Sequence, residues 1–155
     1  NNFGLSSSPS VSRLLVFGEA DGHNSLYPRQ DREPIYSEEV RLETLTGYVD
    51  QHSVDKIDYL KIDVEGNELD VLRGVAEMLS EERIDTVQFE YGEQYIGSRV
   101  FLKDVMEFLA GFNYDLFKIM PRGLRAIPSY DTRLENFLNS NYVLMLRGSA
   151  MRRGA

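Results

Sequence analysis

Carboxylates follow two apolar stretches near the middle of the chain, and they are the best candidates for chemistry. Asp63 and Glu65 come directly after the apolar run that ends at Ile62, and Glu90 ends the next such run. In an open α/β sheet, ligands bind outside the carboxyl ends of the strands. Since neighbouring strands lie about 4.8 Å apart, we expect Asp63 and Glu90 to converge on one pocket. Converging carboxylates can act as a general base, hold a divalent cation, or bind the amine and hydroxyl groups of a cofactor.

Two charged residues beside these carboxylates have simpler explanations. Glu68 falls in the first turn of a predicted helix, where negative charge is favourable, so we predict that it caps the helix; the same explanation stays open for Glu65. Lys61 lies inside an otherwise apolar strand, on the same face as Tyr59 and Asp63. Because an unpaired buried ammonium is costly, we predict that Lys61 forms an ion pair with a nearby carboxylate.

The composition excludes several other chemistries. The chain has 155 residues and no Cys, so it offers no thiolate nucleophile, disulfide framework or Cys metal site. The two histidines, His23 and His52, lie in polar segments without a partner at metal-ligand spacing, and we expect both to be exposed. The 17 Lys and Arg against 25 Asp and Glu give a net charge of −8, which disfavours binding to nucleic acid.

The apolar runs are short. The longest contain four residues, at 14–17 and 143–146. Neither could span a bilayer or form the core of a signal peptide. We therefore expect no membrane span and a cytoplasmic location.

The elements that must position the carboxylates alternate along the second half of the chain. The pattern predicts strands at 59–64, 86–91, 114–120 and 141–146, with one helix opening at Asn67 and a second capped by Ser98. Strand–helix alternation indicates parallel strands joined by right-handed crossovers. No long helix separates the last two strands, so they should pair antiparallel at the sheet edge. The predicted fold class is α/β, with a mostly parallel sheet and an antiparallel edge pair.

The first third of the chain is less regular. We predict strands at 13–17 and 40–42, and a short helix that Thr44 caps. The segment at 14–22 looks like a strand that enters a phosphate-binding loop, but two prolines and no helical pattern follow it, so we reject that function.

The clearest motif lies at residues 60–68, which read Leu-Lys-Ile-Asp-Val-Glu-Gly-Asn-Glu, followed by Val-Leu-Arg-Gly at 71–74. This run strongly resembles the Lys-Ile-Asp-Val-Glu-Gly-x-Glu hallmark, and the Leu-x-Gly element after it, of the FkbM family of S-adenosylmethionine-dependent methyltransferases. Residues 40–45 resemble the family's Val-x-x-x-Thr-Leu segment, and residues 87–90 resemble its next strand, which ends in Glu. The resemblance covers nearly the whole chain and is loose after Pro121.

The resemblance implies a Rossmann-like class I methyltransferase sheet and S-adenosylmethionine as the cofactor. The implied reaction is methyl transfer to a hydroxyl oxygen of a small molecule or glycan. Asp63 would lie beside the methyl-transfer site as general base, cofactor contact or metal ligand, with Glu65 and Glu90 in the same pocket. Residues 22–34 would form a substrate-side lid whose Asn24 and Ser25 contact the acceptor. A divalent metal stays open, without an assigned ligand set.

The sequence also departs from the family. The family's glycine-rich Asp-x-Gly-Ala-Asn-x-Gly loop and the acidic end of its second strand are not found in it. We therefore expect the C-terminal portion of the domain at 1–148, lacking the first two strands of the sheet, and a tail at 149–155. Such a sheet would expose a strand edge suited to homo-oligomerisation, and the chain alone would bind cofactor weakly and show little activity.

Two alternatives to a methyltransferase remain open. One is a non-catalytic Rossmann-like interaction or dimerisation module. The other is a Mg²⁺-dependent hydrolase that uses the cluster of Asp63, Glu65 and Glu90.

Overall fold

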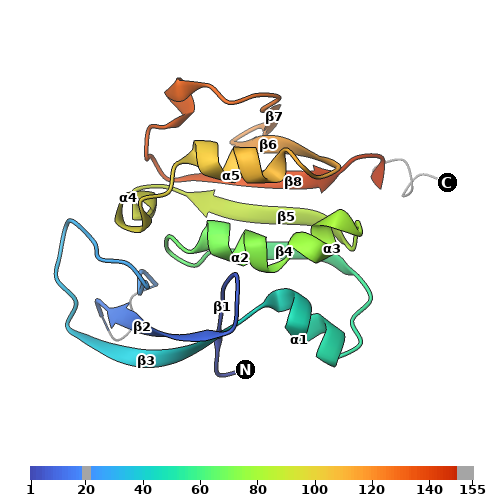
Figure 1. Ribbon diagram of the computed structural model, residues 1–155. Helices are drawn as coiled ribbons and strands as arrows, with labels where there is room; N and C mark the ends of the chain where they lie inside the picture. Colours follow the sequence, from blue (N-terminus) through green and yellow to red (C-terminus); the bar gives the residue numbers. More distant parts are fainter. Residues whose placement is uncertain (19–21, 150–155) are drawn as a thin grey trace.

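The computed structural model describes residues 1–18 and 22–149, which form two β-sheets with helices packed against the larger one (Figure 1). Part of the segment at 14–22 and most of the predicted tail at 149–155 lie outside these residues. The chain is mixed α/β, as its sequence predicts.

The smaller sheet has three strands in the order β1-β3-β2. β1 (Gly4–Leu5) runs parallel to β3 (Tyr36–Glu43), and β2 (Ser10–Val16) runs antiparallel to it. The strands predicted at 13–17 and 40–42 correspond to β2 and to the end of a longer β3. Helix α1 (Leu45–Gln51) follows, and its predicted cap is confirmed because the Thr44 side chain accepts a hydrogen bond from the Gly47 N–H.

The larger sheet has five strands in the order β4-β5-β8-β6-β7. The bounds are β4 Ile57–Ile62, β5 Ile84–Tyr91, β6 Tyr114–Met120, β7 Gly123–Ala126 and β8 Ser140–Leu146. β4 and β5 pair in parallel, as predicted, but they are joined by two short helices, α2 (Glu68–Gly74) and α3 (Ala76–Ser80), where one helix was predicted.

The prediction of a mostly parallel sheet with an antiparallel edge pair is wrong in its pairing. In the larger sheet only β4 and β5 form a parallel pair, whereas β5·β8, β8·β6 and β6·β7 are all antiparallel. β6 and β8 do pair antiparallel, but β8 inserts between β5 and β6, and the edge strand is β7. The reason is burial: β8 is the more apolar strand and is buried along most of its length, whereas every residue of β7 is exposed.

Helices α4 (Gln94–Ser98) and α5 (Leu102–Leu109) connect β5 to β6. Ser98 ends α4 rather than capping α5, so that prediction is wrong. The left-handed backbone of Arg99 (φ 58°) breaks the helix there. The N-terminal end of α5 is instead capped from a distant segment, because the Leu102 and Lys103 N–H groups donate to the Glu135 carboxylate at 3.1 and 2.8 Å.

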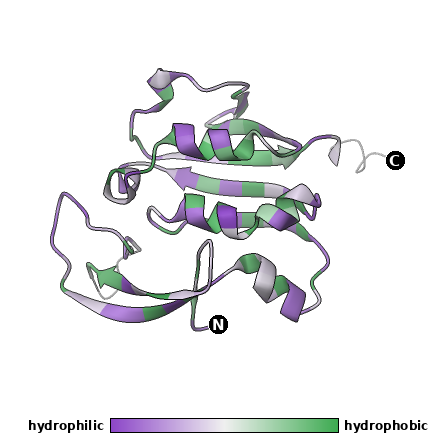
Figure 2. Ribbon diagram, viewed as in Figure 1, coloured by the Kyte–Doolittle hydropathy of each residue, from purple (hydrophilic) through white to green (hydrophobic). Residues whose placement is uncertain are grey.

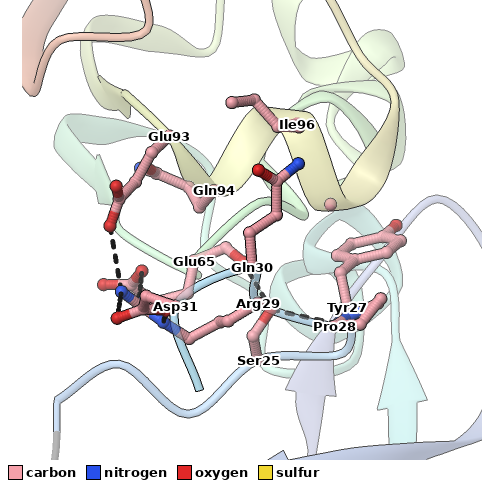
Figure 3. A pocket seen from close by; sticks show the side chains of 11 residues that line it. Ser25, Tyr27, Pro28, Arg29, Gln30, Asp31, Glu65, Glu93, Gln94 and Ile96 are labelled. Atoms are coloured by element: carbon pink, nitrogen blue, oxygen red, sulfur yellow. Dashed lines mark hydrogen bonds and ion pairs between the residues drawn. The ribbon is translucent and has the colours of Figure 1, made fainter. Parts of the chain in front are cut away.

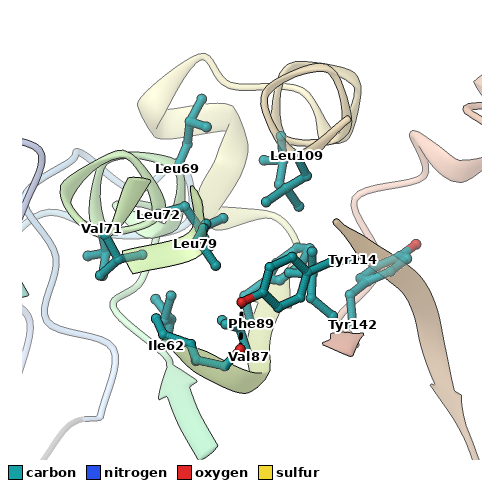
Figure 4. Close-up of a cluster of buried hydrophobic side chains, with 14 of the residues drawn as sticks. Ile62, Leu69, Val71, Leu72, Leu79, Val87, Phe89, Leu109, Tyr114 and Tyr142 are labelled. Atoms are coloured by element: carbon teal, nitrogen blue, oxygen red, sulfur yellow. Dashed lines mark hydrogen bonds between the residues drawn. The ribbon is translucent and has the colours of Figure 1, made fainter. Parts of the chain in front are cut away.

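The hydrophobic core lies between the larger sheet and the helices that cover one of its faces (Figure 4). Its side chains come from α2, α3 and α5 and from the strands beneath: Ile62, Leu69, Val71, Leu72, Leu79, Val87, Phe89, Leu109, Tyr114 and Tyr142. Figure 2 shows that β8 is hydrophobic over most of its length, whereas β3 carries hydrophilic residues. The larger sheet is thus the rigid part that positions the carboxylates. In the described part of the chain, no helix is long and apolar enough to cross a membrane.

Candidate functional site

A tight turn follows β4 and carries two of the predicted site residues. Glu65 and Gly66 both have left-handed backbone, with φ of 54° and 108°. Gly66 suits this position twice over, because a Cβ there would be strained at positive φ and would lie 3.0 Å from the Gln94 carbonyl oxygen. The turn therefore places Asp63 and Glu65 at the carboxyl end of β4.

Glu68 holds this turn from within. Its side chain is fully buried, and its carboxylate accepts hydrogen bonds from the Val64 N–H at 3.1 Å and the Gly66 N–H at 2.9 Å. Burial raises the pKa of Glu68 to about 7, against the opposing effect of those N–H groups. Glu68 therefore has a structural role, but it differs from the predicted helix cap: the N-cap residue of α2 is Asn67, and Glu68 secures the turn before the helix.

The structure brings the three predicted carboxylates together. Asp63, Glu65 and Glu90 each present one oxygen atom, and the three atoms lie within 4.8 Å of one another. The parallel register, which places Ile62 opposite Phe89, is the cause, because it sets the two strand ends side by side. The predicted convergence of Asp63 and Glu90 is confirmed.

Neighbouring charges give Asp63 and Glu90 different proton affinities. The Lys61 ammonium forms an ion pair with Asp63, as predicted, and this contact lowers the pKa of Asp63. Burial and the nearby Asp63 charge raise the pKa of Glu90. The two carboxyls lie within hydrogen-bonding distance of each other, and the Asn139 side chain forms a hydrogen bond with Glu90 as well. Divergent pKa values in adjacent carboxyls are typical of acid–base pairs in enzymes.

These carboxylates open into a cleft of about 470 Å³. Its walls come from segments far apart in the sequence: Gly22, His23, Arg29, Asp63, Glu65, Glu90, Glu93, Gln94, Phe137, Leu138 and Asn139. We call it the acidic cleft. Four carboxylates line it, and Leu138, 67% exposed, adds an apolar surface. The prediction that His23 is exposed is confirmed, although this residue also lines the cleft.

A single arginine ties the 22–34 loop to the acidic cleft (Figure 3). The Arg29 guanidinium lies 2.9 Å from Glu93 Oε1, 2.9 Å from Asp31 Oδ1 and 4.0 Å from Glu65 Oε2. Its side chain is only 12% exposed. A smaller pocket of about 80 Å³ shares Arg29, Glu65 and Glu93 with the acidic cleft and extends to Ile96 of α4. Arg29 therefore compensates part of the negative charge of the acidic cleft.

Asn24 and Ser25, the predicted acceptor contacts, both have structural partners. The Asn24 side chain accepts a hydrogen bond from the Phe17 N–H at 3.0 Å. Ser25 is buried; its hydroxyl donates to the Glu65 carbonyl oxygen at 2.6 Å and accepts from the Tyr27 N–H at 3.0 Å. Ser25 thus helps to hold the turn that carries Glu65, and contact with an acceptor stays a prediction for both residues.

The comparison with protein families agrees with this geometry. The model of the methyltransferase FkbM domain matches residues 5–116, which is most of the chain. The chain belongs to the FkbM methyltransferase family. No curated protein and no solved structure matches it. The FkbM match includes the turn after β4, all of β5 and the loop that carries Arg29, and it ends early in β6.

Sequence reasoning missed two contributors to this FkbM site. Arg29 lies in a charged, proline-containing loop, and Asn139 lies in a segment with no helical or strand pattern. A signal for Arg29 did exist, because a site that gathers several carboxylates needs cations nearby. Nothing in the sequence places Asn139 beside Glu90, since that contact depends on β8 pairing with β5.

Proposed function

We propose that this protein takes part in S-adenosylmethionine-dependent methyl transfer to a hydroxyl oxygen of a small molecule or glycan. The observation that carries the proposal is the hydrogen-bonded Asp63–Glu90 pair at the carboxyl ends of two adjacent parallel strands, within the segment that matches the FkbM family. The exposed Leu138 side chain offers an apolar surface for the carbon skeleton of the acceptor.

The chemistry of the acidic cleft fits a cationic cofactor. S-adenosylmethionine, when bound, supplies a methyl group on a positively charged sulfur, and its transfer depends chiefly on in-line positioning of the acceptor oxygen. Asp63, whose pKa is lowered, is the anionic group best placed to attract that charge or to hold the cofactor's amine. Glu65 adds a second carboxylate on the same turn.

Glu90 is the better proton acceptor of the pair. A general base works best when its pKa approaches the operating pH, and the pKa of Glu90 is raised whereas that of Asp63 is lowered. In this mechanism Asp63 orients the acceptor hydroxyl and the hydroxyl proton moves to Glu90. Asn139 positions the Glu90 carboxyl through their hydrogen bond.

The test is transfer of labelled methyl groups from S-adenosylmethionine to a panel of hydroxyl-bearing small molecules and glycans. We expect Asp63→Asn and Glu90→Gln each to lower the rate by about 10²–10⁴-fold, the usual contribution of a positioned acid or base. Removal of Glu90 should also abolish the fall in rate at acid pH.

Asp58→Asn is the matched control, because Asp58 is an exposed carboxylate on the same strand. It should leave the rate unchanged. Circular dichroism would verify that each variant is folded. Turnover by Asp63→Asn and Glu90→Gln at the rate of the Asp58→Asn variant would refute the catalytic role of the pair.

A second candidate rests on the spacing of the carboxylates. Three oxygen ligands within 4.8 Å of one another could hold Mg²⁺ for metal-assisted hydrolysis. Lys61 and Arg29 compete with a cation for these oxygens, so we rank this function second. Calorimetric titration with Mg²⁺ and Mn²⁺ decides it, and an absence of heat would eliminate the hydrolase.

The edge of β4 leaves an interaction role open beside catalysis. Within the described residues β4 pairs with β5 alone, and Tyr59 on β4 is 53% exposed. An unpaired strand edge can pair with a second copy. Light scattering tests this, and a monomer at every concentration would eliminate self-association through β4.

A further inference from the structure

A second cleft lies toward the β7 edge of the larger sheet and carries the opposite charge. Lys118 of β6 lies directly across from Arg125 of β7 and, on its other side, from Tyr142 of β8. Residues directly opposite in antiparallel strands share one face of the sheet, so these three side chains form one row. The Lys118 ammonium lies 5.5 Å from the centre of the Tyr142 ring.

Lys118 and Arg125 of this row line a cavity of about 440 Å³, which we call the basic cleft, whereas the buried Tyr142 is covered and does not line it. Its lining residues come from β6, β7 and the segment that follows: Lys118, Arg125, Ala126, Ile127, Pro128, Ser129, Asp131, Arg133, Leu134 and Asn136. Three cations face one carboxylate, since Asp131 is the only acidic residue among these lining residues and is paired with Arg133 at 2.5 Å. The excess of positive charge is notable in a chain whose net charge is −8.

Tyr142 supplies a second, independent observation. Its side chain is fully buried, and its hydroxyl is the buried side-chain polar atom that lacks a hydrogen-bond partner within the described residues. Figure 4 shows the hydroxyl turned away from the other labelled core side chains. Burial and the nearby Glu135 charge raise the pKa of this phenol, against the smaller opposing effect of the Arg125 guanidinium, so the hydroxyl keeps its proton and can donate. A buried donor without a partner calls for an acceptor that is absent from the protein itself.

We propose that the basic cleft binds the phosphoryl group of a small molecule, with Lys118 and Arg125 as donors in its wall. The Tyr142 hydroxyl becomes a third donor when the Lys118 side chain, which lies over the Tyr142 ring, turns toward the ligand. A guanidinium fork matches the oxygens of a phosphate, an ammonium adds a compact charge, and a phosphoryl group has enough oxygens for all three donors. Asn136 adds an amide at the rim of the cleft.

This site is separate from the acidic cleft and does not depend on methyl transfer. Every donor named for it lies after residue 116, where the FkbM match ends. One segment of the chain lines both clefts: its residues Leu134 and Asn136 line the basic cleft, and the next residues, Phe137 and Leu138, line the acidic cleft. A phosphorylated molecule bound in one cleft therefore lies close to the chain that shapes the other.

The test is titration of the whole chain with inorganic phosphate and with glycerol phosphate. NMR chemical shifts monitor the binding at constant ionic strength. We expect saturable shifts in residues 118–142, and affinity lower by about tenfold in Arg125→Gln and in Tyr142→Phe, the loss expected for one hydrogen bond to a charged group. Tyr142→Phe removes only the hydroxyl, so the core keeps its packing.

Arg122→Gln is the matched control, since Arg122 lies in the turn between β6 and β7 but does not line the cleft. An equal loss of affinity in Arg122→Gln, or unchanged affinity in Tyr142→Phe, would overturn the proposal, because binding would then follow net charge alone. Absence of saturable shifts would overturn it as well. Sedimentation with vesicles that contain phosphatidic acid distinguishes a lipid headgroup from a soluble ligand. If the protein binds these vesicles, loses that binding in Arg125→Gln and does not bind glycerol phosphate, a soluble ligand is excluded.

Discussion

The acidic and basic clefts are built on the same sheet in different ways. In the acidic cleft, Asp63 and Glu90 lie at the carboxyl ends of two paired parallel strands, and the turn after β4 is fixed by the fully buried Glu68. In the basic cleft, Arg125 lies on an edge strand whose residues are all exposed. The turn that carries the acidic cleft is thus held by a buried carboxylate, whereas Arg125 of the basic cleft lies on an exposed strand.

This difference has an energetic consequence. Charges that are buried or hydrogen bonded to the backbone contribute to folding, and removing one leaves its partners unsatisfied. Exposed cations contribute little to folding and are available for a ligand. Substitution of the buried groups that hold the acidic cleft should therefore affect stability, whereas substitution of the exposed cations of the basic cleft should affect binding alone.

The largest effect is expected for Glu68→Ala. The substitution leaves the Val64 and Gly66 N–H groups without their acceptor and opens a cavity beneath the turn. We expect the free energy of unfolding to fall by about 3 kcal/mol, measured by urea denaturation. Glu77→Ala, an exposed position on α3, is the control and should change stability by less than about 0.5 kcal/mol. Equal losses in both variants would contradict the comparison.

The pH dependence of stability tests the same residue without removing it. The pKa of Glu68 is about 7 in the folded protein and 4.5 in the unfolded chain, so the folded state binds the extra proton between these values. Its contribution is complete below pH 4.5 and is lost as pH rises through about 7, an effect of about 3 kcal/mol at most. Glu68→Gln should flatten this part of the profile in thermal unfolding, and an unchanged slope would exclude Glu68 as its source.

A smaller effect is expected for Arg29→Gln. The change removes the cation between Glu65 and Glu93, of which Glu65 is the more buried. We expect a loss of about 1 kcal/mol in denaturant unfolding, because the pair with Glu93 is screened by solvent. Arg32→Gln, in the same loop but outside both pockets beside Arg29, serves as the control. A loss of stability as large as that of Glu68→Ala would show that the ion pairs of this loop stabilise the fold as strongly as the buried Glu68 does.

The smallest effect is expected for Arg133→Gln in the basic cleft. The Arg133 side chain is 89% exposed, and its pair with Asp131 is a surface salt bridge. Stability should change by less than about 0.5 kcal/mol in the same denaturation assay. A larger loss would mean that the basic cleft, too, is held together by its charges.

The sequence predicted well those parts of the fold that local patterns encode. The parallel β4–β5 unit follows from a strand–helix–strand pattern, and the convergence of Asp63 with Glu90 follows from the strand ends. The Thr44 cap follows from residue type at a helix start. Ser98 shows where this reasoning fails: it has the residue type of a cap, but Glu135, distant in sequence, supplies the cap of α5.

The residues of the turn after β4 were enough to indicate the family and the carboxylates of the acidic cleft. The periodic apolar residues around that turn were enough to predict the β4–β5 unit. Only the tertiary structure decided the strand order, because β8 competes for the place beside β5 through its burial rather than its position in the chain. That insertion brings Asn139 to Glu90 and Tyr142 to Lys118. Pairing between distant strands depends on which apolar surfaces are buried together, and a local pattern does not contain that information.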